Sequence, residues 1–136
     1  MQKSFPFVTD DIVQAGVGLA GGGDCSVMGS CGAFSGGLMV LSAKFNPRSD
    51  ILSEKELEQL AYARSKLDRF RDWFISEFGS VTCQGVQFNV FGRVYNIMED
   101  EELEKMREYQ QGLGKSCSEI AKNAALKVAE ILYQEK

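Results

Sequence analysis

The sequence contains no histidine. This absence excludes the serine–histidine–aspartate triad, the cysteine–histidine nucleophile pair, zinc sites with histidine ligands and histidine-ligated haem, since all of them require an imidazole. It also excludes the CxxCH motif through which c-type haem is attached. The chemistry of the chain must therefore depend on other side chains.

Long apolar runs and an excess of positive charge are also missing. No run reaches the roughly 18 apolar residues typical of a membrane span, and residues 1–9 lack the apolar core of a signal peptide. The net charge of −4 argues against a nucleic-acid surface and against binding to an anionic membrane, because both need clustered Lys and Arg. We therefore expect a soluble cytoplasmic protein that binds neither nucleic acid nor membrane.

The composition is that of one globular domain. The 136 residues are 44% hydrophobic and 25% charged, so we expect a single helical cysteine-site domain over residues 1–136. Apolar periodicity and capping residues predict an all-α, compact bundle of about five helices with a glycine-rich cysteine loop near the N-terminus. The predicted helices cover residues 10–20, 31–44, 54–78 and 100–110, and a last helix follows Ser116.

The helix over residues 54–78 has the clearest signals. Ser53 and Glu56 form a capping box, apolar residues recur at helical spacing, and Gly79 provides a stop. We predict that its row of aromatic side chains belongs to the core. The next segment is ambiguous: Ser80 is a candidate cap, and residues 86–95 fit either a short extended stretch or a distorted helix.

Nine of the fourteen glycines fall within residues 15–37. Each glycine inside a helix costs about 0.8–1.0 kcal/mol relative to alanine. We therefore predict close approach of a backbone or a cofactor at the face formed by Gly32, Ser35 and Gly36, with tight helix packing without a ligand as the alternative. A phosphate loop at residues 18–23 is disfavoured, because no strand precedes it and no Lys-Ser/Thr pair follows.

The four cysteines, Cys25, Cys31, Cys83 and Cys117, are the candidate metal ligands. They form no CxxC pair, but the last three fall in the first turns of predicted helices. Unpaired backbone N–H groups at a helix start stabilise a thiolate, so we expect lowered pKa values there. If these starts converge, they form one shared site that Cys25 completes from the glycine loop. The alternative is that each cysteine is a small buried hydrophobe.

The segment Ser30-Cys31-Gly32-Ala33-Phe34-Ser35-Gly36-Gly37-Leu38-Met39, the segment FGSVTC at 78–83 and Cys117 before the last helix together carry a resemblance. They resemble the bacterial and archaeal C_GCAxxG_C_C family of redox-active proteins. Two features depart from that family. No cysteine precedes Cys25, and the family's Gly-Cys-Ala order appears here as Cys31-Gly32-Ala33.

The resemblance implies a helical domain with a cysteine-bound redox or metal centre. A related domain occurs in split-Soret cytochromes, where it is associated with an iron–sulfur site and a dimer. The resemblance therefore implies an iron–sulfur cluster, with [2Fe-2S] favoured, and a homodimer. Haem cannot be carried over, because the chain has no histidine.

Three functions remain open from the sequence. The leading hypothesis is an iron–sulfur cluster held by Cys25, Cys31, Cys83 and Cys117, which serves electron transfer or redox sensing with a redox partner protein. The second is a metal-independent thiol–disulfide oxidoreductase that uses a pair such as Cys25 and Cys31. The third is an interaction module with a structural zinc site.

Overall fold

The fold is described from a computed structural model that places residues 1–48, 53–113 and 115–135. These residues form six α-helices, one 3₁₀-helix and no β-strand, apart from an isolated bridge. The helices are α1 (Asp10–Val17), η1 (Ala20–Gly22), α2 (Gly32–Phe45), α3 (Glu54–Phe78), α4 (Cys83–Phe91), α5 (Asp100–Leu113) and α6 (Cys117–Tyr133). The all-α prediction is confirmed, although the described residues form six α-helices where about five were expected.

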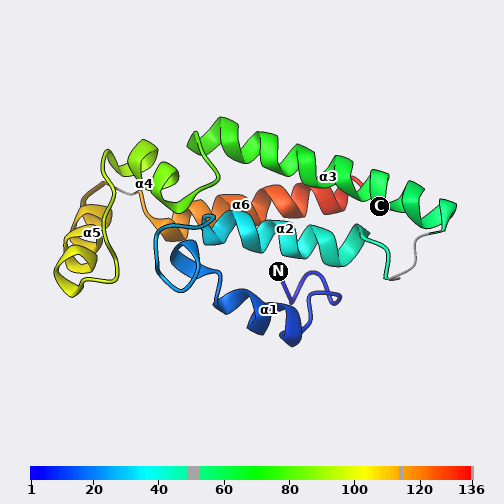
Figure 1. Cartoon of the computed structure of the whole chain (residues 1–136), viewed down its shortest axis with the longest axis horizontal. Coiled ribbons are helices and arrows are strands. Elements are labelled where there is room, and N and C mark those ends of the chain that lie inside the picture. The colour runs from blue at the N-terminus through cyan, green and yellow to red at the C-terminus, as the bar shows by residue number, and fades with distance from the viewer. Residues whose placement is uncertain (49–52, 114, 136) are drawn as a thin grey trace.

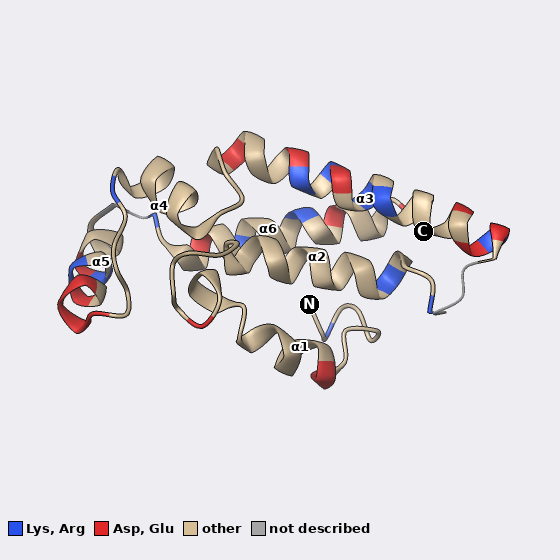
Figure 2. Ribbon diagram, in the orientation of Figure 1, with Lys and Arg blue, Asp and Glu red and all other residues tan. Residues whose placement is uncertain are grey.

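Helix α2 lies at the centre of the molecule. It packs against α3, α6 and α1, and Figure 1 shows it running between them. Its one charged residue is Lys44 in the last turn, whereas charges are frequent along α3 and α5 (Figure 2). A helix with a single charge at its end, surrounded on several sides, suits a core position. None of the described helices combines the length and apolar character that crossing a membrane would require.

The core is built on aromatic side chains of α3. Phe70 and Phe74 are fully buried and pack against Phe34 of α2, with ring centroids 5.8 and 5.2 Å from the Phe34 ring. The prediction that the aromatic row of this helix is core is therefore confirmed. Gly37 of α2 faces the same rings, and a Cβ placed on it would overlap Phe70. Close helix packing thus explains this glycine.

The capping box predicted at Ser53 is present, and the cap predicted at Ser80 is wrong. The carboxylate of Glu56 accepts a hydrogen bond from the backbone N–H of Ser53 at 2.8 Å, as a capping box requires. At α6 the cap is made in the opposite direction, because the hydroxyl oxygen of Ser116 accepts from the backbone N–H of Glu119 at 3.1 Å. Helix α4, however, is capped by Thr82 and not by Ser80, and the segment is helical up to Phe91. The extended alternative for residues 86–91 is therefore wrong.

Helix α5 lies at one end of the molecule, beside α4 (Figure 1). The ring of its Tyr109 contacts Phe91 and Tyr95, with centroids 5.9 and 6.2 Å apart. Arg93 and Glu102 form an ion pair across the same junction. These contacts hold the segment after α4 against α5. In the same segment, the backbone N–H of Tyr95 donates a hydrogen bond to the side chain of Gln87.

Candidate functional site

A short backbone bridge joins the starts of α2 and α4. Ser30 pairs with Thr82 in an isolated antiparallel β-bridge. Two backbone hydrogen bonds of 2.8 and 2.9 Å flank this pair, and their donors are the N–H groups of Cys31 and Cys83. Cys31 is the N-cap residue of α2, and Cys83 is the first residue of α4. The bridge therefore brings two cysteines together from distant parts of the sequence.

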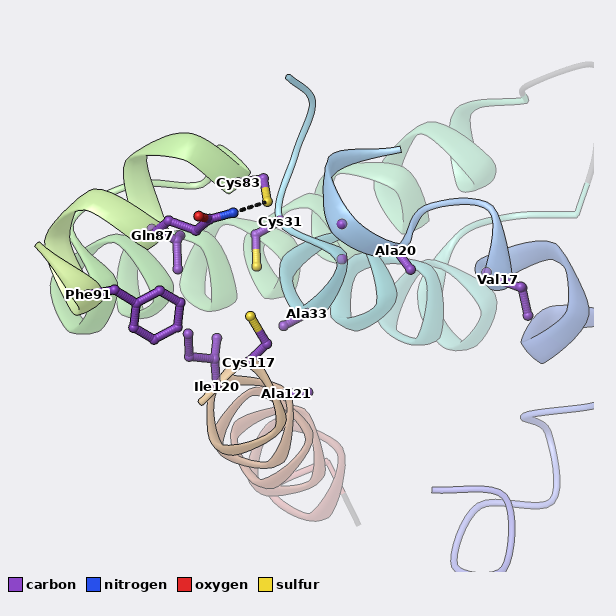
Figure 3. A pocket seen from close by; sticks show the side chains of 14 residues that line it. Val17, Ala20, Cys31, Ala33, Cys83, Gln87, Phe91, Cys117, Ile120 and Ala121 are labelled. Atoms are coloured by element: carbon purple, nitrogen blue, oxygen red, sulfur yellow. Dashed lines mark hydrogen bonds between the residues drawn. The ribbon is translucent and has the colours of Figure 1, made fainter. Parts of the chain in front are cut away.

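The third cysteine comes from α6. Cys117 is the first residue of that helix, and its side chain points into the same space as those of Cys31 and Cys83 (Figure 3). This space is a cavity of about 460 Å³. Besides the three cysteines, it is lined by Gly16, Val17, Ala20, Gly21, Gly32, Ala33, Val86, Gln87, Phe91, Ile120 and Ala121. Three of the four predicted ligands thus meet at one largely apolar cavity.

The fourth cysteine does not line the cavity. Cys25 is exposed and belongs to the loop between η1 and α2. Its sulfur lies beside Gly21, where an added Cβ would be 3.2 Å away. Its backbone is in the left-handed region, with φ of 58°, and its N–H donates to the carbonyl of Ala20 at 3.0 Å. Cys25 is therefore near the cavity but is held outside it.

Two glutamines donate hydrogen bonds to cysteine sulfurs. Gln87 is 2% exposed; its Nε2 lies 3.6 Å from Sγ of Cys83, and its Oε1 accepts from the backbone N–H of Tyr95 at 2.7 Å. In α5, Nε2 of Gln110 lies 3.7 Å from Sγ of Cys117. Neither glutamine was predicted as a site residue from the sequence. The only local signal for Gln87 was its position four residues after Cys83, which places it on the same helix face.

Comparison with known proteins identifies the family. A family model described as "Putative redox-active protein (C_GCAxxG_C_C)" matches residues 1–131, a span that includes all four cysteines and both glutamines. The chain belongs to this family. No curated protein matches the chain, and no solved structure does either. The resemblance found in the sequence is confirmed, and membership of the C_GCAxxG_C_C family supports a redox role.

Two thiols of this C_GCAxxG_C_C protein, those of Cys83 and Cys117, have raised pKa values. Burial raises the pKa of Cys83, the hydrogen bond from Gln87 acts in the opposite direction, and the charges of Cys31 and Cys25 raise it further. The pKa of Cys117 rises to about 11, chiefly because the surrounding protein desolvates its thiol, although the residue is exposed at the cavity. The expectation of lowered values at these two helix starts is wrong, because desolvation and like charge outweigh the backbone N–H groups.

The glycine-rich segment packs around the cysteines. Gly22, with φ of 83°, lies so close to Cys83 that an added Cβ would be 2.9 Å from the Cβ of that residue. Gly32 approaches the backbone of η1, with an added Cβ 3.1 Å from Cα of Ala20. The predicted close approach of a backbone is therefore found at Gly32.

The predicted cofactor face is not assembled as a unit. Of Gly32, Ser35 and Gly36, the first lines the cysteine cavity and the other two do not. Gly36 instead borders a separate groove between α2 and α6, with no atom within 4 Å of an added Cβ. Among the described residues, no group of three or more cysteine or carboxylate side chains could hold a metal ion as placed.

Proposed function

We propose that this C_GCAxxG_C_C protein binds an iron–sulfur cluster through cysteine thiolates of the cavity and uses it for electron transfer or redox sensing. The observation that carries this proposal is the meeting of Cys31, Cys83 and Cys117 at one cavity, each from the start of a different helix. These thiolates would hold the cluster. When bound, such a cluster accepts and releases an electron.

The surroundings of the thiols suit an anionic cluster. Helix starts present backbone N–H groups and the positive end of the helix dipole. Gln87 and Gln110 add side-chain N–H donors beside two of the sulfurs, and hydrogen bonds to sulfur are among the features that set the potential of a cluster. The raised thiol pKa values are compatible with this role, since metal binding displaces thiol protons.

The size of the cavity favours a cluster over a single zinc ion. A tetrahedral zinc site gathers its sulfurs about one point, with Zn–S distances of about 2.3 Å. The cavity of about 460 Å³ offers room for a centre with several metal atoms. Apolar lining residues such as Phe91 and Ile120 would limit the access of water to it.

A disulfide between the two bridged cysteines, Cys31 and Cys83, fits this geometry less well than a shared metal centre. Cys31 and Cys83 occupy diagonal positions about the Ser30–Thr82 bridge. Diagonal neighbours are farther apart than directly opposed residues, whereas a disulfide requires Cβ atoms about 3.8 Å apart. All four cysteines are free. Bond formation between Cys31 and Cys83 would therefore require the backbone to move.

The experiment is metal and sulfide analysis of protein purified without oxygen from iron-replete cells. We expect iron and acid-labile sulfide together, and a visible absorption that dithionite bleaches. Cys31→Ser is the matched control and should lose both. Colourless protein with neither iron nor sulfide would contradict the proposal. Zinc alone would favour the structural zinc site, and a metal-free, reversibly oxidised cysteine pair would favour the oxidoreductase.

The proposal extends to the redox partner, the cellular compartment and the oligomeric state of the protein. A cluster that cycles between two states requires a redox partner protein, and four reduced cysteines suit the cytoplasm, where thiols stay reduced. A homodimer is the assembly that the family resemblance implies. Size-exclusion chromatography with light scattering, on protein with its cluster intact, tests that assembly.

A further inference from the structure

Among the residues that the structure describes, the cavity wall supplies three sulfur ligands and no fourth. Fourteen residues line it, and their side chains carry donor atoms at only four positions: the three cysteines and Gln87. The Gln87 amide is already engaged, because its oxygen accepts from Tyr95 and its nitrogen donates to Cys83. On the side of α1 the wall consists of Gly16, Val17 and Ala20, none of which has a side chain that binds metal.

The loop that carries Cys25 is tied down by its own backbone. The N–H groups of Asp24, Cys25 and Val27 donate to the carbonyls of Gly18, Ala20 and Gly21 at 2.9, 3.0 and 2.8 Å. The side chain of Val27 is buried, at 3% exposure. Moving the backbone of Cys25 toward the cavity would break these hydrogen bonds and would expose the buried side chain of Val27. These hydrogen bonds and the burial of Val27 thus hold the loop in place.

We infer that the centre is held by three protein thiolates, from Cys31, Cys83 and Cys117, and that Cys25 is not a ligand. The inference rests on the proposed function. Since clusters of the common types take four terminal ligands, a cluster held by these three thiolates would leave one position to a small ligand from solvent. Water or hydroxide at that position would be exchanged for a small anion without a change in oxidation state.

The first test compares single serine variants for iron and sulfide content. Cys25→Ser should keep the content of the parent protein, whereas Cys31→Ser, Cys83→Ser and Cys117→Ser should each lose most of it. Circular dichroism serves as the folding control. If Cys25→Ser lost iron to the same extent as Cys31→Ser, the inference would be overturned while the proposed function stood. An iron-free parent protein would end both.

The second test probes the open position with cyanide. Electron paramagnetic resonance of the reduced protein should change on addition of cyanide, in the parent and in Cys25→Ser alike. If cyanide left the spectrum of the reduced parent protein unchanged, the open coordination position would be overturned.

Discussion

Ser30 and Thr82 face each other across an isolated antiparallel bridge, and the residue after each of them is a cysteine that begins a helix. The bridge fixes the relative position of Cys31 and Cys83 through backbone hydrogen bonds, which do not depend on the identity of the side chains. Two potential ligands are thereby set in place before any metal arrives. Such preorganisation is what a binding site gains from a rigid scaffold.

The packing of Gly22 against Cys83 gives the first prediction. Gly22→Ala adds a Cβ 2.9 Å from the Cβ of Cys83 and puts a side chain on a residue with φ of 83°. We expect the unfolding free energy to fall by about 1–3 kcal/mol and the iron content to drop. Gly18→Ala is the matched control, because Gly18 has φ of −67° and open space around an added Cβ. Equal stabilities in urea unfolding would contradict this account.

The two adjacent glycines of α2 provide the second prediction. Gly37→Ala should destabilise the protein by about 1–3 kcal/mol, because its Cβ would overlap the buried ring of Phe70. Gly36→Ala should instead stabilise it by up to about 1 kcal/mol through helix propensity, since nothing lies within 4 Å of its Cβ. Thermal unfolding measures both. Loss of iron in Gly36→Ala would restore this residue as a cofactor contact.

The glutamine donors lead to the third prediction. Gln87→Leu removes the donor to Cys83 and leaves the backbone N–H of Tyr95 without its acceptor. We therefore expect the free energy of unfolding to fall by about 1–3 kcal/mol. Gln110→Leu removes a partly exposed donor to Cys117. It should lower the free energy of unfolding by less than about 1 kcal/mol. If the cluster is present, both variants should lower its reduction potential, because N–H donors favour the more negative, reduced state.

A redox titration of the two glutamine variants and the parent protein measures this effect. Parent-like potentials in both variants would show that these amides only support the fold. A shift in Gln110→Leu with parent-like stability would separate the electrostatic effect from a structural one.

The pKa of Cys117 gives the fourth prediction, for protein prepared without metal. With a pKa of about 11, about one thiol in a thousand is ionised at pH 8, against about a quarter for an ordinary thiol. Iodoacetamide should therefore modify Cys117 slowly at pH 8 and faster as the pH approaches 11. The residue is exposed, so slow modification would report its ionisation more than its access. Peptide mass spectrometry with Cys25 as the exposed internal reference measures the rates.

The same shift predicts how stability depends on pH. The folded state holds the Cys117 proton more tightly than the unfolded chain, so this contribution to stability is complete below the ordinary thiol pKa. It is lost as the pH rises from about 9 towards 11. Cys117→Ser should flatten that part of the curve of unfolding free energy against pH. A parent curve that is already flat between these values would contradict the assignment.

The sequence by itself determined the helical class and much of its detail. The capping box at Ser53, the aromatic row of α3 and the placement of three cysteines at helix starts depend on spacings of a few residues, which the chain displays directly. The absence of histidine likewise excluded several kinds of site before any fold was known. Local propensity and short-range hydrogen bonds explain why these features can be predicted.

Only the tertiary structure decided which residues share the cavity. The Ser30–Thr82 bridge, the amide of Gln87 beside Cys83, and the position of Cys25 outside the cavity all depend on how α2, α4 and α6 pack. The pKa of Cys117 likewise depends on neighbours that converge only in the fold. Such contacts join segments far apart in the chain, so the spacing of residues along the sequence does not predict them. The physical reason is that desolvation and close approach are properties of the packed molecule, whereas a helix start is a property of its own few residues.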